Sequence, residues 1–431
     1  MEIQNIVNQC KKSAIILSAL SGKVKNRALE QIIQELQKSK TAIISSNKKD
    51  LETAHKENLE APLLKRLKFD EAQIDETCAG IRSLIQLEDP VGKTLSATQL
   101  DEELELFKVS RPIGVIGVIF ESRPDALVQI ACLCLKSGNA VLLKGGSEAA
   151  ATNHTLARLI HDAGVSSGLP QGWLGLLETR SEVDQMLSLD KAIDLIIPRG
   201  SNDFVRYIMD HTIIPVLGHA DGICHVYIDK TADLNMAVSL SIDSKCQYVA
   251  VCNAAETILV HQDIADDFLP LLQAELEERG VKILGCHHTQ KIINVEAATK
   301  KDWQTEYLDY IISIRVVPSL EAALTHINEY GSGHTDVIIA EDKNRAVTFM
   351  DHADTADAFW NCSSRFADGF RFGLGAEVGI STNKIHARGP VGLEGLMIYQ
   401  WRLLGRGHKV EDYSGDNARS FQHTPMKKNF Y

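Results

Sequence analysis

Apolar and polar positions alternate at helical spacing over residues 1–90, as in AIILSALSGKVKNRALEQIIQELQKS (14–39). Apolar residues three and four positions apart share one face of a helix, so the spacing predicts two or three amphipathic helices here. The next apolar stretch, LELFKVSRPIGVIGVIF (104–120), is rich in β-branched residues and is split by Pro112. This composition predicts strands joined by a kink at the proline.

From residue 140 onward, short apolar runs alternate with helical patterns. Strand and helix pairs are expected at 140–144 with 148–163, at 173–177 with 181–189, and at 192–198 with 201–211. Further strands are expected at 225–229, 256–260, 281–285 and 335–340, with helices at 263–279, 319–330 and 342–352. Gly280 follows the first of these helices at a natural C-cap position. This alternation predicts an α/β fold with parallel sheets and right-handed crossovers.

Length and charge narrow the class of protein. A chain of 431 residues is too long for one hydrophobic core, so two or three domains are expected. No apolar run approaches the roughly 20 residues that cross a bilayer, and Glu2 stands where a signal peptide would have cationic residues. We therefore expect a cytoplasmic protein without a membrane partner. The net charge of −12 argues against nucleic acid as the main partner.

The nine cysteines are scattered and include no C-x-x-C pair, so neither a disulfide framework nor a zinc ribbon is expected, and no metal is predicted. Cys252 is the candidate nucleophile, because an apolar run delivers it and small residues (Asn253 and two alanines) follow it. Small neighbours leave room for a carbonyl group, and nearby N–H groups can bind an oxyanion. Cys246 is a rival, whereas Cys132 and Cys134 fit the apolar face of a helix.

Three glycine-bearing turns suggest a bound nucleotide, although the sequence contains no G-x-G-x-x-G. They are LLKGGSEA (142–149), GLPQGWLGLL (168–177) and IPRGSNDFVRYI (197–208), each interpreted as following a strand and preceding a helix. Glycine lets backbone N–H groups approach an anion, and a helix N-terminus favours negative charge. Lys144 can pair with a phosphate, and Ser201 can either contact a pyrophosphate or cap the helix. The alternative is that all three are ordinary turns.

Together these motifs resemble a known family. The order KGGSEA, GLPQG, RGSN, PVLGHADG and the cysteine loop is similar to the aldehyde dehydrogenase superfamily, as are FWNCSSRFADG (359–369) and VGLEGL (391–396). Within it, VPSLEAALTHINEYGSGHTDVI (317–338) resembles the signature of the γ-glutamyl phosphate reductases. FESRPD (120–125), CQYVAVCNAAE (246–256) and NKIHARGPVGLEGL (383–396) match that family too. The resemblance extends over about residues 10–410.

The resemblance implies an aldehyde dehydrogenase-like fold with three parts. These are a Rossmann-like NADPH-binding domain (1–93 and 113–230), an α/β catalytic domain (231–400) and a small oligomerisation flap (94–112 and 401–431). It also implies a homo-oligomer that reduces γ-glutamyl phosphate to glutamate 5-semialdehyde, the second step of proline biosynthesis, through a thioester on Cys252. A glutamate kinase is a possible transient partner, because the acyl phosphate is labile.

The predicted site residues fall into three groups. Cys252 and Asn253 are assigned to catalysis. The predicted cofactor contacts are Glu121, Ser122, Arg123, Pro124, Lys144, Gly145, Gly146, Ser147, Pro170, Arg199, Gly200 and Ser201. The predicted substrate contacts are His219, His334, Asp336, Arg365 and Arg388. Alternatives remain for some of them: a packing role for His334 and His326, a cap for Asp336, and a solvated surface charge for Arg365.

The chain departs from the superfamily pattern at two places. Hydrolysing aldehyde dehydrogenases have a glutamate before a Leu-Gly pair, whereas Val216 precedes Leu217 and Gly218 here and cannot activate water. The FESRPD segment replaces the usual oxyanion loop, which leaves Arg123, Asn253 and the Cys252 N–H as candidate oxyanion donors. Two rival functions stay open: a hydrolysing aldehyde dehydrogenase, and a non-catalytic oligomeric scaffold that retains the fold.

Overall fold

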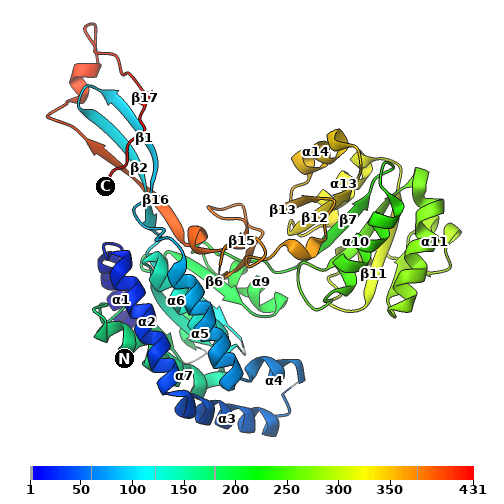
Figure 1. The fold of residues 1–431 in the computed structure, drawn as a ribbon, viewed down its shortest axis with the longest axis horizontal. Helices are drawn as coiled ribbons and strands as arrows, with labels where there is room; N and C mark the ends of the chain where they lie inside the picture. The colour runs from blue at the N-terminus through cyan, green and yellow to red at the C-terminus, as the bar shows by residue number, and fades with distance from the viewer. Residues whose placement is uncertain (1–2, 60, 122, 179–180, 376) are drawn as a thin grey trace. The chain divides into compact units, whose positions relative to one another are not determined.

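The computed structural model describes residues 3–59, 61–121, 123–178, 181–375 and 377–431 (Figure 1). It divides into two compact units. Unit 1 comprises Met1–Gly200, Tyr207–Leu217 and Val391–Tyr431, and unit 2 comprises Ser201–Arg206 and Gly218–Pro390. These boundaries differ from the expected divisions after residues 230 and 400. The reason for the first difference is that Cys224–Ile228 forms a strand inside the sheet of unit 2.

The N-terminal region of unit 1 is entirely helical, but its helices number five in the described residues, so the expectation of two or three was wrong. They are α1 (Ile3–Leu17), α2 (Gly22–Lys38), α3 (Lys40–Lys56), α4 (Ala61–Leu67) and α5 (Glu71–Gln86). The 14–39 stretch contains the end of α1 and all of α2, because the chain leaves the helix between Leu17 and Gly22. Helix α5 begins with a capping box in which Asp70 accepts hydrogen bonds from the N–H groups of Ala72 and Gln73.

A four-stranded parallel sheet forms the core of unit 1. Its strands lie in the order β5 (Leu174–Leu177), β4 (Ala140–Gly145), β3 (Val115–Phe120) and β6 (Leu195–Arg199). The helices that alternate with them in the chain are α6 (Pro124–Ser137), α7 (Ala150–Ser166), α8 (Ser181–Leu187) and α9 (Asn202–Asp210). Every residue of β3 and β4 is buried, as expected for strands covered on both faces. The three predicted strand and helix pairs are therefore confirmed.

A seven-stranded sheet forms the core of unit 2, and all six of its strand pairings are parallel. The order is β10 (Glu296–Ala297), β9 (Lys282–Gly285), β11 (Ile311–Val317), β8 (Ala255–His261), β7 (Cys224–Ile228), β12 (Thr335–Ile339) and β13 (Asp357–Trp360). Its helices are α10 (Leu234–Cys246), α11 (Gln262–Glu278), α12 (His287–Ile292), α13 (Leu320–Tyr330) and α14 (Lys343–His352). One apolar cluster packs α10 and α11 against the sheet, and another packs α13 and α14 (Figure 1). Gly280 has φ +69°, the left-handed conformation expected after α11.

The two segments assigned to the flap pair with each other in an antiparallel sheet. Its order is β16 (Met397–Leu404), β2 (Leu104–Pro112), β1 (Thr94–Asp101) and β17 (Thr424–Pro425). Pro112 ends β2, and β3 begins three residues later in a different sheet, so the predicted break at the proline is confirmed. A two-stranded sheet of β14 (Gly379–Ser381) and β15 (Gly389–Val391) completes the strands.

Two bulk expectations can be compared with the structure. All nine cysteines are free thiols. Among the helices of the described ranges, none has both the length and the apolar composition needed to span a bilayer.

Candidate active site

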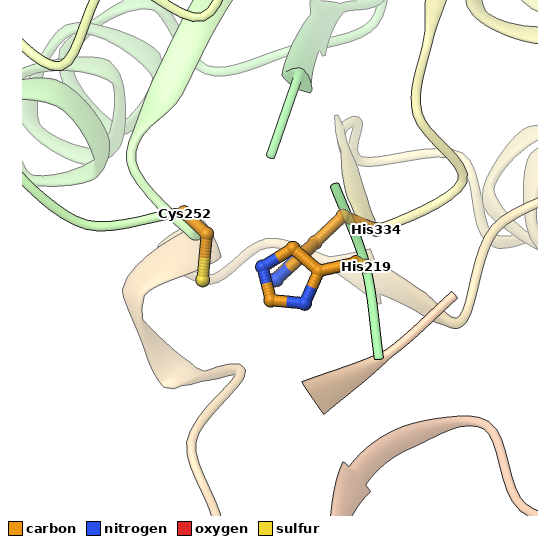
Figure 2. A group of neighbouring side chains, drawn as sticks. All are labelled: His219, Cys252 and His334. Atoms are coloured by element: carbon orange, nitrogen blue, oxygen red, sulfur yellow. The ribbon is translucent and has the colours of Figure 1, made fainter. Parts of the chain in front are cut away.

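Three loops meet at the amino-terminal edge of the unit 2 sheet. Strands β8, β7 and β12 are neighbours and run parallel, so the loops that enter them reach the same edge. Cys252 lies in the loop before β8, His219 in the loop before β7, and His334 immediately before β12. One ligand atom from each side chain lies within 4.8 Å of the others. Figure 2 shows a ring nitrogen of His219 on the side that faces the Cys252 sulfur.

The loop of Cys252 is held on two sides. A Cβ atom on Gly222 would lie 2.3 Å from the Cys252 carbonyl oxygen and 2.5 Å from its Cα, so only glycine fits there. The thiol of Cys224 donates to the same carbonyl oxygen across 3.1 Å. From the other side, the Ser364 hydroxyl donates to the Asn253 carbonyl at 2.6 Å. These contacts position Cys252 through its backbone and leave its side chain directed into the cluster.

Asn253 helps to anchor this loop. Its side chain is 4% exposed, and its Nδ2 donates to the carbonyl oxygen of Ala367 at 2.8 Å. Because one amide hydrogen is used in this way, the side chain has a structural role that the sequence did not indicate. The assignment of Asn253 as an oxyanion donor remains a prediction.

The tautomers of the two histidines follow from their partners. His219 Nδ1 lies 2.9 Å from the Ile380 carbonyl oxygen, which can only accept, so Nδ1 carries the hydrogen. His334 Nδ1 lies 2.8 Å from the Thr335 hydroxyl, which itself donates to Asp357 Oδ2 across 3.5 Å. In the neutral form of either ring the lone pair is therefore on Nε2. His334 is fully buried, and its Nε2 has no hydrogen-bond partner among the described residues.

Burial also determines the charge of His334. Loss of solvent, with a smaller contribution from the neighbouring His219, lowers the pKa of His334 well below the ordinary value. The two rings meet edge to face with centroids 5.0 Å apart. His334 is consequently a neutral imidazole at physiological pH.

Arg365 supplies positive charge near the sulfur. It lies in the 3-10 helix η3 (Ser364–Phe366), is 8% exposed, and donates from Nε to Gln247 Oε1 at 2.9 Å. Burial and the nearby Arg371 lower the pKa of Arg365, while interaction with Cys252 raises it. The same interaction favours the thiolate form of Cys252. The alternative of a solvated surface charge is therefore wrong.

Most of the other thiols are in surroundings that disfavour ionisation. Burial raises the pKa of Cys246, Cys132, Cys134 and Cys224. Cys286 is different: burial raises its pKa, but hydrogen bonds from Thr289 and Val316 outweigh this and bring it below the ordinary value. That thiol caps α12 and is not part of the His219, Cys252 and His334 group.

Asp336 does not belong to the group either. It lies within β12, is 1% exposed, and its Oδ1 lies 2.8 Å from His225 Nδ1 and accepts from the His225 N–H. The register pairs Asp336 with His225, so the predicted cap is wrong. Its Oδ2 has no hydrogen-bond partner among the described residues, and its contact with the substrate remains a prediction. Arg388 Nε donates to the Thr382 carbonyl oxygen at 3.2 Å, and its guanidinium pairs with Asp354 at 3.2 Å. Its role toward the substrate remains a prediction.

His326, for which packing was the favoured role, is buried and engaged. Its Nδ1 lies 2.7 Å from Arg315, and burial lowers the pKa of His326 to about 2. This environment agrees with a structural role.

Most of the predicted cofactor contacts lie in unit 1, at the carboxyl-terminal edge of its sheet. Phe120 at the end of β3 pairs with Gly145 of β4 and with Arg199 of β6. Strands β4 and β5 lie on one side of β3 and β6 lies on the other, so the strand order reverses between β3 and β6. In open α/β sheets nucleotides bind at such a reversal. Ser122 lies outside the described residues, and Ser201 begins the first segment of unit 2.

The turn after β4 is compact and leads into the 3-10 helix η1 (Ser147–Ala149) and then α7. Lys144 is 7% exposed and donates from Nζ to the Gly145 carbonyl oxygen. A Cβ on Gly146 would lie 2.0 Å from Glu148 Oε1, so a carboxylate packs directly against this turn. The glycines of this turn fit a phosphate, whereas Glu148 opposes one. The Ala151 and Thr152 N–H groups at the start of α7 already donate to the Asp50 carboxylate at 3.1 and 2.8 Å.

The GLPQG turn is placed differently from the prediction. It follows α7 and precedes β5, so it is a helix-to-strand turn. In a parallel sheet this puts Pro170 at the amino-terminal edge, opposite Phe120, Gly145 and Arg199. A Cβ on Gly172 would lie 2.6 Å from the backbone of Gln9, so this glycine serves packing against α1. Pro170 is therefore removed from the predicted cofactor contacts.

The sequence did not indicate the roles of Gly222, Cys224 and Ser364, which hold the Cys252 loop. It also did not predict that His219 and His334 flank the same sulfur. The sequence contains one usable signal, because Gly222 ends the PVLGHADG motif just before a strand. The neighbour relations of β7, β8 and β12 cannot be read from chain order.

Comparisons with known proteins place the chain among relatives. A model of the aldehyde dehydrogenase family matches residues 2–290. The γ-glutamyl phosphate reductases of Pelotomaculum thermopropionicum and Acetivibrio thermocellus are each 59% identical over 430 residues, covering 100% of this chain and 99% and 100% of theirs. The solved γ-glutamyl phosphate reductase of Thermotoga maritima is 38% identical with a TM-score of 0.93, covering 95% of this chain and 100% of its own. An acetylating aldehyde dehydrogenase from Geobacillus thermoglucosidasius, 17% identical with a TM-score of 0.64 over 95% of this chain and 97% of its own, shares the fold.

Proposed function

The chain belongs to the γ-glutamyl phosphate reductase family within the aldehyde dehydrogenases, and we propose that it reduces L-glutamate 5-phosphate to L-glutamate 5-semialdehyde and phosphate with NADPH. This reaction is the second step of proline biosynthesis from glutamate. The observation that carries the proposal is the cluster of Cys252 with His219 and His334 on a loop held by Gly222 and Ser364. A thiolate is a strong nucleophile and a good leaving group, which suits both halves of the reaction.

In the proposed mechanism, the Cys252 thiolate attacks the acyl carbon and the C–O bond to phosphate breaks, which leaves a thioester. NADPH supplies the hydride when it is bound. The thiohemiacetal formed on Cys252 then releases the semialdehyde and regenerates the thiol. No step needs an activated water, in agreement with an aliphatic Val216 that is 8% exposed.

Two side chains support the chemistry of the sulfur. His219 Nε2 has the lone pair, because Nδ1 is bound to the Ile380 carbonyl, and it can accept the Cys252 proton and later return it. Arg365 interacts electrostatically with Cys252, which favours the thiolate and, in the same place, an anionic leaving phosphate. His334 is neutral and buried, so we assign it to orienting the group rather than to binding negative charge.

The cofactor is proposed to bind at the carboxyl-terminal edge of the unit 1 sheet. Backbone N–H groups of the glycine turn before η1, together with Lys144, would hold its phosphates, since the Ala151 and Thr152 N–H groups at the start of α7 already donate to Asp50. Glu121 and Arg199 border the same reversal point. The preference for NADPH over NADH is the finer part of the proposal. It requires a 2′-phosphate to be accepted near Glu148, and competitive titration of both cofactors tests it.

We also propose that the chain is a homo-oligomer joined through the flap sheet. Strand β16 is an edge strand, and its large apolar side chains are exposed: Ile398, Tyr399, Trp401, Leu403 and Leu404. An unpaired strand edge with apolar side chains is a natural surface for a second copy. Analytical ultracentrifugation of Trp401→Lys tests this, since an unchanged mass would contradict it.

The decisive experiment runs the reaction in reverse with the purified chain. Glutamate 5-semialdehyde and NADP are supplied with and without inorganic phosphate, and NADPH formation is followed by absorbance. We expect phosphate-dependent turnover, because water attacks a thioester slowly without a positioned base, a contribution of about 10²–10⁴-fold.

The other outcomes distinguish the rival functions. Sustained turnover to glutamate in phosphate-free buffer would mean that a water-activating base exists elsewhere, as in a hydrolysing aldehyde dehydrogenase. A complete absence of NADPH formation by folded protein would support the non-catalytic scaffold.

A further inference from the structure

We propose that Cys252, His219 and His334 form a binding site for one zinc-class divalent ion, and that occupation of this site inhibits the enzyme reversibly. The three side chains each offer one ligand atom, and these atoms lie within 4.8 Å of one another (Figure 2). The reaction needs no metal, so the site is inhibitory. Metal binding itself is independent of the proposed function, and only the inhibitory consequence rests on Cys252 being the nucleophile.

The donor set selects the class of ion. Two imidazoles and a thiolate are ligands that Zn²⁺, Co²⁺ and Cd²⁺ favour, whereas Mg²⁺ and Ca²⁺ require oxygen ligands. Three protein ligands also leave one tetrahedral position for water. The ion expected here is therefore Zn²⁺ with one sulfur, two nitrogens and a solvent oxygen.

The distances are close to what such a site needs. Ligands about 2.0–2.3 Å from a tetrahedral ion are roughly 3.3–3.6 Å apart. The ligand atoms here would have to move together by about 1 Å from their 4.8 Å limit. Cys252 and His219 are partly exposed and lie in loops, so they can make this movement, while buried His334 provides the fixed point.

Both imidazoles are already oriented for a metal. His219 Nδ1 is bound to the Ile380 carbonyl, and His334 Nδ1 to Thr335, whose hydroxyl donates to Asp357. Metal-binding histidines characteristically donate their second nitrogen to a carbonyl or to a carboxylate-linked group in this way.

A second observation points to a ligand independently. His334 is fully buried, and its Nε2 is without a hydrogen-bond partner among the described residues. Buried polar atoms are nearly always paired, so this nitrogen is suited to an additional partner. A metal ion at the cluster would satisfy it.

The chemical consequence is inhibition without oxidation or reduction. As Sγ binds the ion, the Cys252 thiol releases its proton to solvent and the sulfur lone pair is used in the metal bond. A coordinated sulfur cannot attack an acyl carbon, so a chelator that removes the ion should restore the thiol unchanged.

The test uses Co²⁺ and Zn²⁺ on the purified, chelator-treated full chain. Co²⁺ should bind one ion per chain and show thiolate-to-metal charge transfer together with the absorption of a tetrahedral centre. Zn²⁺ should displace it, and should protect Cys252 from alkylation by iodoacetamide as measured by mass spectrometry. These readouts need no turnover, so they succeed or fail separately from the proposed function.

Variants identify the ligands. Cys252→Ser should remove the charge-transfer band, and His219→Asn and His334→Asn should each weaken Zn²⁺ binding by more than the roughly 10–100-fold that an outer contact is worth. Cys246→Ser, which alters a half-buried thiol outside the cluster, should leave binding unchanged. Equal Zn²⁺ affinity in Cys252→Ser would overturn the proposal. If the histidine variants fail to fold, the alkylation of wild-type Cys252 decides, since an unprotected thiol at saturating Zn²⁺ overturns it equally.

Discussion

The two parallel sheets of this protein present their candidate sites at opposite edges. In unit 1, the residues assigned to the cofactor gather where β3, β4 and β6 end. In unit 2, the candidate reactive group of Cys252, His219 and His334 lies where β7, β8 and β12 begin. The same α/β architecture therefore presents two kinds of candidate site.

The difference is one of chemistry. At the carboxyl-terminal edge, a glycine turn follows β4 and can offer backbone N–H groups to an anion, while Asp50 already accepts from the Ala151 and Thr152 N–H groups at the start of α7. At the amino-terminal edge of the unit 2 sheet, the candidate group consists of side chains on loops that tertiary contacts hold in place. Those contacts are the Cys224 thiol, the Ser364 hydroxyl and the close approach of Gly222.

The strongest test of the amino-terminal edge is Cys252→Ser. A serine hydroxyl is far less nucleophilic and a poorer leaving group, so we expect activity to fall by at least about 10⁴-fold while the fold is retained. Steady-state kinetics with NADPH and circular dichroism measure the two properties. Cys246→Ser is the matched control and should stay active, because burial raises the pKa of that thiol. Normal turnover by the Cys252 variant would move the chemistry elsewhere.

A second test asks whether position alone matters at this edge. Gly222→Ala adds a Cβ within 2.3–2.5 Å of Cys252 backbone and side-chain atoms, so the loop must shift. A displacement of about 1 Å at a reacting group can cost about 10²-fold, and we expect a loss of that size in kcat. Gly80→Ala in α5, where an added Cβ meets nothing within 4 Å, is the control. Unchanged kcat in Gly222→Ala would show that the loop tolerates movement.

The sequence predicted the two regions unequally, because unit 1 depends on local patterns and the candidate site of unit 2 depends on tertiary contacts. Period and turn signals predicted nearly all the strands and helices around the unit 1 sheet, because these are local properties. Two predictions for this unit were wrong. Five helices lie in the described N-terminal region where two or three were expected, and GLPQG was assigned to the wrong kind of turn.

The candidate site of unit 2 was predictable only in part. Small residues around Cys252 and the family resemblance indicated the nucleophile. The sequence could not show that Arg365 is buried beside it, or that Asp336 pairs through Oδ1 with His225. Both facts depend on which strands are neighbours in the sheet, and this information is spread over residues more than 100 positions apart.

A third prediction concerns the cost of burying polar groups at the amino-terminal edge. Burial at the start of β13 raises the pKa of Asp357 to about 7, with Thr335 partly opposing this. The folded pKa lies above the unfolded value near 3.9, so the stabilising proton is fully held below about pH 4 and is lost as pH rises through about 7. An asparagine at this position does not titrate, so the Asp357→Asn variant has no such proton to lose as the pH rises. The variant's free energy of unfolding should therefore fall less than the wild type's between about pH 5 and 8, by a few kcal/mol at most.

Denaturant titrations at several pH values measure this effect. Asp354→Asn is the control, because Lys384 lowers the pKa of Asp354 and its contribution is lost only as pH falls. That variant should leave the slope between about pH 5 and 8 unchanged. Parallel curves for wild type and Asp357→Asn would mean that Asp357 is ionised at neutral pH in the folded protein.

The smallest effect is expected at the carboxyl-terminal edge, where recognition by backbone groups leaves one side chain to tune specificity. The Glu148 carboxylate packs against Gly146 in the turn proposed to hold the phosphates of the cofactor. A 2′-phosphate would be repelled by it, and unit charges about 4 Å apart in water interact by about 1 kcal/mol. Glu148→Gln keeps the size and hydrogen-bonding capacity of the side chain and removes the charge. It should therefore tighten NADPH binding about fivefold relative to NADH, because only NADPH has the 2′-phosphate. Glu30→Gln on exposed α2 changes the net charge equally and should leave the ratio of the two dissociation constants unaltered. If Glu148→Gln also leaves that ratio unaltered, the 2′-phosphate does not lie beside this turn, and the preference for NADPH must come from other residues of unit 1.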